Sequence, residues 1–353
     1  AKLQRDISKF NNIQMARKIQ LNSAYGAIGN QYFRYYNLAN AEAITLSGQV
    51  SIRWIANKMN EYLNKVLKTK EVDYVIAADT DSIYLNLGPL VETVYEGREK
   101  TDESVTTFLN KVCEVELEPY IESSYETLAS YVNAYEQKMI MKRENIASSG
   151  IWTAKKRYIL NVWDSEGVRY NEPKLKMMGI EAVKSSTPMP CRDAIKNALK
   201  IMMSGSEEDL ISFIDNFKDE FDLLPPEDIA FPRSVNGLRK FKASGTVYSK
   251  GTPLHVRGTL LYNFYVAKNK LEYKYPLVQE GEKIKYLYLR RPNKLGNENV
   301  LSFLNTFPKE LGLAGQIDRD AQFKKAFLDP LRIITNVIGW ETERVANLEF
   351  LFA

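Results

Sequence analysis

The chain contains little histidine and little cysteine. Of its 353 residues, one is histidine, His255, and two are cysteines, Cys113 and Cys191. A single histidine excludes His-rich metal sites, and we interpret His255 as structural. Two cysteines cannot build a disulfide framework or a Cys-rich zinc site, which fits a reducing cytoplasm.

Long hydrophobic runs are also missing. No apolar stretch is long enough to span a bilayer, so we expect neither a membrane anchor nor a signal peptide. Hydrophobic residues make up 44% and charged residues 26% of the chain, as in ordinary soluble globular proteins. The length predicts two or three domains.

Acidic residues are absent from one long segment. Residues 231–271 hold no Asp or Glu but eight basic residues: Arg233, Arg239, Lys240, Lys242, Lys250, Arg257, Lys268 and Lys270. Residues 138–184 hold ten basic against five acidic residues. Segments of this kind favour a polyanionic partner, with a solvated basic surface as the alternative.

The most informative segment is residues 74–85, in which two aspartates separate two apolar runs. We predict a β-hairpin with Asp79, Thr80 and Asp81 at its tip. Two carboxylates there repel each other unless a divalent cation lies between them. Three chemistries use such a site: nucleotidyl transfer by paired metals, glycosyl transfer from a metal-bound sugar nucleotide, and aspartyl-phosphate hydrolysis. A solvated acidic turn is the alternative.

A second group lies in a predicted helix over residues 2–27. Lys18, Asn22 and Tyr25 are spaced i, i+4, i+7 and share one face. Lysine suits a triphosphate, asparagine can bond phosphate or sugar, and tyrosine can stack on a base pair beside Gly26, which admits a close approach. The alternative is a solvated face of an amphipathic helix.

The remaining elements follow from periodicity and breakers. We expect helices over residues 40–67, 101–135 with an interruption near Pro119, 192–203, 207–224 and 320–331. Strands are expected within residues 138–179 and over 283–290. Residues 231–271 are predicted as loop with short strands. Residues 185–190 are the clearest linker, which places a domain boundary near Thr187.

Three motifs resemble the family B DNA polymerases in order and spacing. They are Lys-x-x-x-Asn-Ser-x-Tyr-Gly at residues 18–26, Asp-Thr-Asp-Ser at 79–82 and Lys-Lys-Arg-Tyr at 155–158. The rest of the chain looks most similar to the family B polymerases of the T-even type of tailed bacteriophage, in segments 33–36, 43–45, 152–153, 161–164, 173–176 and 184–188. The resemblance covers essentially the whole chain and is looser beyond Pro188.

The resemblance implies an α+β fold. It implies a palm with an antiparallel β-sheet flanked by helices, a partial fingers helix, and a mixed, mainly helical thumb. Residues 1–28 would be the second fingers helix, 29–187 the palm, and 188–353 the thumb with a C-terminal tail. The implied location is the cytoplasm of an infected bacterial host.

The resemblance also implies site residues. Asp81 would be the principal and Asp79 the supporting catalytic ligand of two Mg²⁺ ions, with Mn²⁺ as an alternative. The incoming deoxynucleoside triphosphate would contact Lys18 and Asn22 at its phosphates, Tyr25 and Gly26 at the nascent base pair, and Thr80. Glu144 falls at an auxiliary acidic position. Lys142 stands where close relatives can carry another acid, a departure from the family pattern.

Primer–template DNA is the implied main partner. Its primer end would be held by Lys155, Lys156, Arg157 and Tyr158, and its duplex by Arg239, Lys240, Lys242, Lys250 and Arg257. Residues 348–353 correspond to the family's tail that binds a sliding clamp, with a packed or frayed apolar end as the alternative.

The family's exonuclease domain, first palm aspartate and first fingers helix are not in this sequence. Two aspartates supply two negative charges against the four positive charges of two dications. Our hypothesis is therefore that the chain is one half of a split enzyme. An N-terminal polymerase fragment that carries the exonuclease and the first palm aspartate would complete it. The competing explanation is a truncation. An Asp-x-Asp glycosyltransferase and a non-catalytic DNA-binding scaffold derived from a polymerase are the other functional alternatives.

Overall fold

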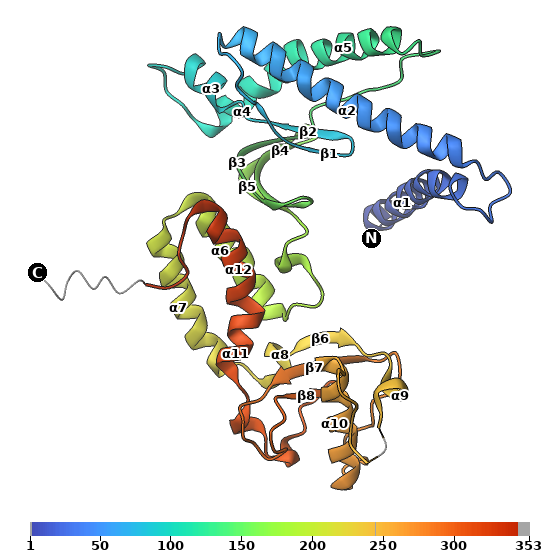
Figure 1. Ribbon diagram of the computed structural model, residues 1–353. Coiled ribbons are helices and arrows are strands. Elements are labelled where there is room, and N and C mark those ends of the chain that lie inside the picture. Colours follow the sequence, from blue (N-terminus) through green and yellow to red (C-terminus); the bar gives the residue numbers. More distant parts are fainter. Residues whose placement is uncertain (1, 244, 345–353) are drawn as a thin grey trace, which may run out of the picture. The chain divides into compact units, whose positions relative to one another are not determined.

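The computed structural model describes residues 2–243 and 245–344, and it combines helices with small antiparallel sheets (Figure 1). The predicted α+β class is therefore confirmed. The chain divides into two compact units. Unit 1 comprises Ala1–Ile146 and Asp164–Arg169, and unit 2 comprises Ala147–Trp163 and Tyr170–Ala353. Among the described residues, no helix combines the length and the apolarity needed to cross a membrane.

Unit 1 has its core between two helices and a hairpin. Ile55, Met59 and Leu63 recur every fourth residue of α2 and are buried, as expected for an inward-facing helical stripe. They join a cluster with residues of α5, and Trp54 Nε1 donates to the Ser124 carbonyl oxygen at 2.9 Å. The elements are α1 (Lys2–Ile28), α2 (Leu38–Val66), β1 (Val75–Asp79), β2 (Ser82–Leu85), α3 (Gly88–Val94), α4 (Asp102–Val112), the π-helical η1 (Cys113–Leu117) and α5 (Glu118–Tyr131).

The helical prediction for residues 101–135 is confirmed, and the interruption has a specific form. The chain stays helical through a π-helical segment, and Pro119 lies in the first turn of α5. The proline therefore lies just after a π-helical turn, an irregularity in the regular α-helical hydrogen-bond ladder that a proline cannot continue.

Three consecutive strands contribute to both units. They are β3 (Asn145–Ala154), β4 (Arg157–Ser165) and β5 (Val168–Met178), hydrogen-bonded in the order β3-β4-β5. Tyr158, Leu160, Val162 and Asp164 of β4 are buried, and so is Ile159; from Leu160 to Ser165 burial alternates. This alternation places an acidic side chain at an inward position.

Unit 2 has one large hydrophobic core that extends from Ile151 to Ile334. Its helix α7 begins with the predicted cap, in which Asp209 N–H donates to Ser206 Oγ at 3.2 Å. The elements are the 3₁₀ turn η2 (Glu181–Val183), α6 (Met189–Ser204), α7 (Glu207–Leu223), α8 (Pro226–Ile229), β6 (Phe231–Ser234), α9 (Leu238–Phe241), α10 (Leu254–Lys268), β7 (Lys283–Tyr288), β8 (Val300–Phe303), the 3₁₀ turns η3 (Lys309–Leu311) and η4 (Ala314–Gln316), α11 (Arg319–Phe323), the π-helical η5 (Lys324–Leu328) and α12 (Asp329–Ile338).

The prediction of loop with short strands for residues 231–271 was wrong over α10. This helix buries side chains on several sides, including Val256, Leu260, Tyr262 and Val266, so its sequence lacks the one-sided stripe that predicts a surface helix. It also lies very close to β8, because a Cβ at Gly258 would be 2.6 Å from Ser302 Oγ. Packing against β8 thus accounts for a helix that the pattern did not indicate.

Candidate active site

The predicted acidic hairpin is present in unit 1. Asp79 pairs with Ser82 across the antiparallel strands β1 and β2, which places Thr80 and Asp81 in the connecting turn. The hairpin is anchored at its start, because Asn60 Oδ1 of α2 accepts the N–H groups of Tyr74 at 2.8 Å and Val75 at 3.0 Å. The core of unit 1 therefore sets where the two carboxylates lie.

The tip is a three-residue turn in a strained form. The Asp81 N–H donates to the Asp79 carbonyl oxygen at 2.6 Å, and Thr80 has a φ of 55°. An i to i+2 bond around a residue of positive φ is the rare, strained form of the γ-turn. A β-branched residue seldom takes positive φ. Strain of this kind at one position points to a functional constraint.

Other hairpins of the chain give a comparison. The turn between β4 and β5 has positive φ at Glu166 and Gly167, 51° and 87°, and glycine takes such values without steric cost. The turn between β3 and β4 instead uses Lys155 and Lys156, with a φ of 61° at Lys156. The turns at Thr80 and Lys156 thus lack the Asn-Gly or Asp-Gly pair that stability favours.

The carboxylates at the tip suit a hard cation. Asp79 is half-buried, accepts from Thr80 Oγ1 at 2.9 Å through Oδ1, and lies beside the exposed Asp81. Mg²⁺ typically takes one or two protein carboxylates and completes its shell with water and phosphate oxygens. Within residues 2–243 and 245–344, no group of three or more His, Cys, Asp or Glu side chains is arranged to hold a metal ion. The tip alone therefore offers two carboxylates.

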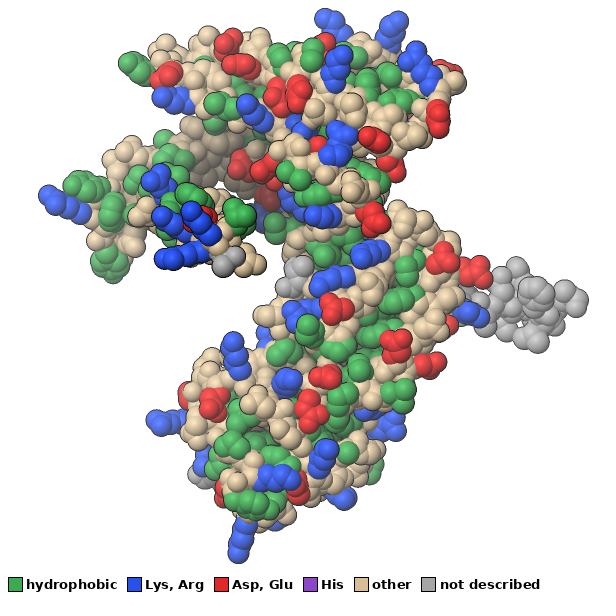
Figure 2. Space-filling view, turned by 180° about the vertical axis from the view of Figure 1, so that it is seen from behind, with side chains coloured by type: hydrophobic (Ala, Val, Ile, Leu, Met, Phe, Trp, Pro, Cys, Tyr) green, Lys and Arg blue, Asp and Glu red, His purple; other side chains and the backbone are tan. Residues whose placement is uncertain are grey.

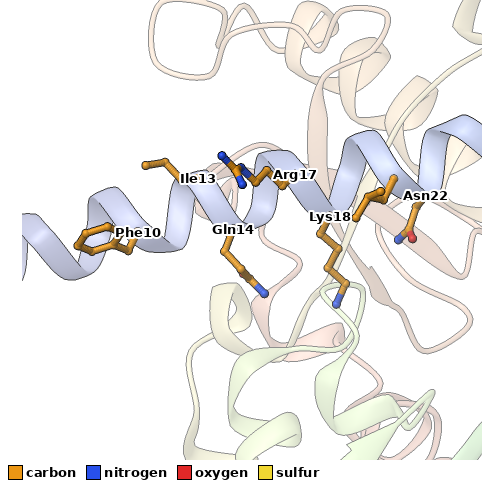
Figure 3. Close-up of a pocket in the computed structure, with 7 residues that line it drawn as sticks. Phe10, Ile13, Gln14, Arg17, Lys18 and Asn22 are labelled. Atoms are coloured by element: carbon orange, nitrogen blue, oxygen red, sulfur yellow. The ribbon is translucent and has the colours of Figure 1, made fainter. Parts of the chain in front are cut away.

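Helix α1 presents the predicted nucleotide-binding residues. Lys18 and Asn22 are exposed, and Figure 3 shows them projecting from the same side of α1 as Gln14. They line a hollow of about 600 Å³ with Phe10, Ile13, Gln14, Arg17 and Leu21. All seven lining residues belong to α1, so the hollow has only one wall.

Tyr25 and Gly26 lie near the C-terminal end of α1. Tyr25 Oη and Thr45 Oγ1 of α2 are hydrogen-bonded at 2.7 Å, and 47% of the Tyr25 residue is exposed. A Cβ at Gly26 would meet no atom within 4 Å. No contact within the described chain therefore requires a glycine at position 26.

The apolar side of α1 is uncovered. The helix has 27 residues, and none of them is buried. Its large exposed apolar side chains are Leu3, Ile7, Phe10, Ile13, Met15, Ile19 and Leu21. A soluble helix normally buries such side chains, and contiguous exposed apolar surface marks an interaction site.

The residues predicted to hold the primer end lie in unit 2, with mixed exposure. Lys155 and Lys156 are exposed in their turn, whereas Tyr158 is buried with its ring centroid 6.3 Å from that of Trp152. Arg157 is paired with Glu181 of η2 at 2.7 Å. Arg157 and Tyr158 therefore have partners within the chain.

The predicted duplex-binding residues are spread over several elements of unit 2. Arg239 and Lys240 lie on α9, Lys242 and Lys250 follow it, and all four are exposed. Arg257 of α10 is half-buried, and its Nη2 donates to Asn299 Oδ1. On the face of unit 2 seen in Figure 2, basic side chains alternate with acidic ones and form no single patch.

The sequence patterns did not predict one buried charge cluster, which Asp164 forms with Arg143 and Arg169. Asp164 of β4 is 2% exposed; its Oδ1 accepts from Arg143 Nη1, and its Oδ2 accepts from Arg169 Nε at 3.3 Å. Burial alone would raise the pKa of Asp164, but the hydrogen bonds and charge of Arg143, with smaller help from Gly167 and Arg169, hold the pKa below its ordinary value. The inward position of Asp164 in an alternating strand was the signal that could have revealed the cluster.

Comparison with known proteins defines the class. Residues 2–125 match the sequence model of the family described as DNA polymerase family B. These residues include α1, α2 and the acidic hairpin. The chain is thus a homologue of the family B DNA polymerases.

Individual relatives narrow the resemblance to the T-even type. The chain is 38% identical over 97% of its length to the DNA-directed DNA polymerase of Enterobacteria phage T4, and 38% identical over 96% of its length to that of Escherichia phage RB69. It is 24% identical over 70% of its length to DNA polymerase 1 of Aeropyrum pernix. The chain spans 39%, 38% and 21% of these three proteins.

Proposed function

We propose that this chain is the C-terminal part of a DNA-directed DNA polymerase, which adds deoxynucleotides to a primer under the direction of a template. The strained Asp79–Thr80–Asp81 tip is the observation that carries the proposal, because it places two carboxylates at the end of a hairpin that packs on the core of unit 1. The homology to family B polymerases supports the reaction class.

Asp81 and Asp79 are proposed to hold two Mg²⁺ ions, with Mn²⁺ as an alternative. When bound, such ions lower the pKa of a primer 3′-hydroxyl and stabilise the departing pyrophosphate. Asp81, exposed at the tip, would be the principal ligand. Asp79 would support it, and the bond from Thr80 Oγ1 would orient its carboxylate. The hydrogen bonds from Asn60 to the start of the hairpin would keep the tip fixed on its core.

Helix α1 is proposed to bind the incoming nucleotide. Lys18 and Asn22 face one side of the helix and would contact the triphosphate as a positive charge and an amide donor. Tyr25 and Gly26 would pack beside the nascent base pair, and the open space at Gly26 supports a close approach there. Residues 1–28 would then be the second fingers helix, 29–187 the palm and 188–353 the thumb.

The turn at Lys155 and Lys156, with Arg157 and Tyr158, is proposed to lie at the primer end, and the exposed cations of unit 2 are proposed to contact duplex phosphates. Arg239, Lys240, Lys242 and Lys250 are exposed and suited to phosphate contacts, and Arg257 would act with them. Residues 348–353, which we propose as a tail that binds a sliding clamp, lie outside the described residues.

We propose that a second polypeptide completes the enzyme. Two observations on the described residues support this proposal: the uncovered apolar side chains of α1 and the single-walled hollow on this helix. Two metal ions also require more negative charge than Asp79 and Asp81 supply. The partner would contribute the first palm aspartate on a strand, a helix for α1, and the exonuclease.

Primer extension tests the proposal. The chain would be mixed with a polypeptide that carries the N-terminal part of the polymerase from the same source, and incorporation of nucleotides into a primed template would be followed with Mg²⁺. We expect extension by the mixture and none by either part. An inactive mixture that still assembles on primed DNA would contradict polymerase function. Equal extension by this chain alone would contradict the need for a partner.

A further inference from the structure

The segment immediately before β3 has an alternating pattern of exposure. Met141 and Arg143 are half-buried, whereas Lys142 and Glu144 are exposed. Met141 packs against the buried cluster of unit 1, against which Ile83 and Leu85 of the hairpin strand β2 also pack. Residues 137–144 belong to no helix or strand, so side-chain contacts must hold them in place.

Arg143 supplies most of these contacts. Its Nη1 donates to Asp164 Oδ1, its Nη2 donates to Asn110 Oδ1 of α4 at 2.6 Å, and its backbone N–H donates to Glu118 Oε1 of α5 at 3.0 Å. The next carbonyl oxygen, that of Glu144, accepts the Glu166 N–H at 2.7 Å. One residue thus ties the segment to two helices and one strand.

The ion pair at the centre of this arrangement is buried. The side chains of Arg143 and Asp164 are 10% and 3% exposed, and Asp164 faces a second guanidinium, that of Arg169. A buried ion pair of this kind often gives no more stability than well-packed apolar side chains would give. Its better-supported use is to specify one arrangement of the chain.

We propose that Arg143 is a positioning residue that sets the place of the Glu144 carboxylate at the polymerase site, an inference that rests on the proposed function. Arg143 faces inward and Glu144 outward on the same segment, so the bonds of Arg143 to Asp164, Asn110 and Glu118 determine where residue 144 emerges. Met141, two residues earlier, packs against the core of unit 1, on which the hairpin also packs. Arg143 touches neither DNA nor nucleotide in this proposal and acts through Glu144.

A double-mutant cycle in the extending two-part complex tests this role. The variants are Arg143→Gln, Glu144→Gln and the double variant, and the readouts are the single-turnover extension rate and the Mg²⁺ concentration for half-maximal rate. We expect each single variant to lower the rate by roughly tenfold and to raise the Mg²⁺ requirement, as for loss of one oriented charged group. The double variant should be no slower than the slower single variant.

Arg169→Gln is the matched control. It removes the other guanidinium from Asp164 but leaves every bond of Arg143 in place. We expect its rate and its Mg²⁺ requirement to stay within about twofold of the unmodified complex. If Arg143→Gln does not fold, Arg143→Lys replaces it: an ammonium can pair with Asp164 but cannot reproduce the two-pronged guanidinium bond to Asp164 and Asn110.

The outcomes separate the two proposals. If the unmodified complex extends primers and the rate losses multiply in the double variant, Arg143 acts independently of Glu144 and only this inference is overturned. An unchanged Mg²⁺ requirement in Arg143→Gln would overturn it as well. If the unmodified complex does not extend primers, the proposed function and this inference fall together.

Discussion

Asp79 and Ser82 face each other across the β1–β2 hairpin, and Ser82 Oγ donates to the Asp79 carbonyl oxygen at 3.1 Å. This pairing leaves two residues, Thr80 and Asp81, to reverse the chain. Asp81 therefore lies at the exposed tip of the hairpin, and the buried Tyr74 lies directly before its first strand.

Replacing Asp81 by Asn should abolish primer extension by the two-part complex while DNA binding persists. The change removes one negative charge from the proposed metal site, and a loss of roughly a thousandfold is expected for an electrostatic contact at a reaction centre. Extension assays and DNA-binding titrations measure the two properties. Glu126→Gln on the exposed side of α5 is the control. Undiminished extension by Asp81→Asn would rule out the proposed role of the tip.

Apolar residues of α1 should matter for association and not for the stability of the isolated chain. Phe10 and Ile13 are 65% and 42% exposed, so Phe10→Ser with Ile13→Ser should change the free energy of unfolding by less than about 0.5 kcal/mol. The buried Ile55 is the comparison, because Ile55→Ala should cost about 2–5 kcal/mol.

Urea denaturation measures both effects on stability, and pull-down with the complementary polypeptide measures association. The α1 double variant should bind that polypeptide weakly although it is folded. A loss of stability in the isolated chain equal to that of Ile55→Ala would show that α1 is already covered.

Gly26→Ala should separate helix stability from function. The new methyl group would meet no atom of the described chain within 4 Å, and alanine favours a helix over glycine by about 1 kcal/mol. The chain should therefore be at least as stable, yet primer extension should fall by roughly tenfold if a base pair packs there. Gly48→Ala on α2, also without a neighbour within 4 Å, should change the stability as Gly26→Ala does but leave primer extension normal.

Affinity for duplex DNA should depend steeply on salt. Each phosphate contact contributes a slope of about −0.9 to log affinity against log salt concentration. Replacing the exposed Arg239, Lys240, Lys242 and Lys250 by Gln should flatten the slope by up to about 3.6, and Lys324→Gln should not change it. Fluorescence anisotropy between low and moderate salt measures the slope. An unaltered slope would identify these side chains as solvated surface.

The free energy of unfolding should fall in acid partly through Asp164. Its folded-state pKa lies below the ordinary value of 3.8 because the bonds and charge of Arg143 outweigh the effect of burial. The stabilisation is therefore complete above that ordinary value and is lost as the pH falls toward the folded-state pKa. Urea denaturation at pH 6 and at pH 3 should show the stability difference between the wild type and Asp164→Asn shrinking in acid.

Glu310 provides a common background for that comparison. Hydrogen bonds from Lys274 and Tyr275 lower the pKa of Glu310 to about 2, which adds the same acid dependence to both proteins. A gap between wild type and Asp164→Asn that stays constant with pH would show that Asp164 is not held ionised by Arg143.

Local patterns in the sequence were sufficient for the elements that carry the candidate site. The spacing of Lys18, Asn22 and Tyr25 predicted a shared helical face; all three lie on α1, and Lys18 and Asn22 project from the same side of it (Figure 3). Apolar runs on both sides of Asp79 and Asp81 predicted the hairpin. Both predictions rest on periodicity and turn chemistry within a few residues, which is why they did not depend on the rest of the fold. The domain limits and the residue roles stay predictions.

Tertiary structure alone decided the features that depend on partners far along the chain. The helix α10 lacks a one-sided apolar stripe and is defined by its close packing on β8, where Gly258 approaches Ser302, 44 residues further along the chain. Arg143 and Asp164 form their ion pair across 21 residues of chain. The positive φ of Thr80 appears only in the structure, in the turn closed by the bond from the Asp81 N–H to the Asp79 carbonyl oxygen. Sequence by itself determined where charges and helical faces occur, because those are properties of neighbours. Which charges become buried together is decided by the packing of distant segments, because burial is a property of the whole fold.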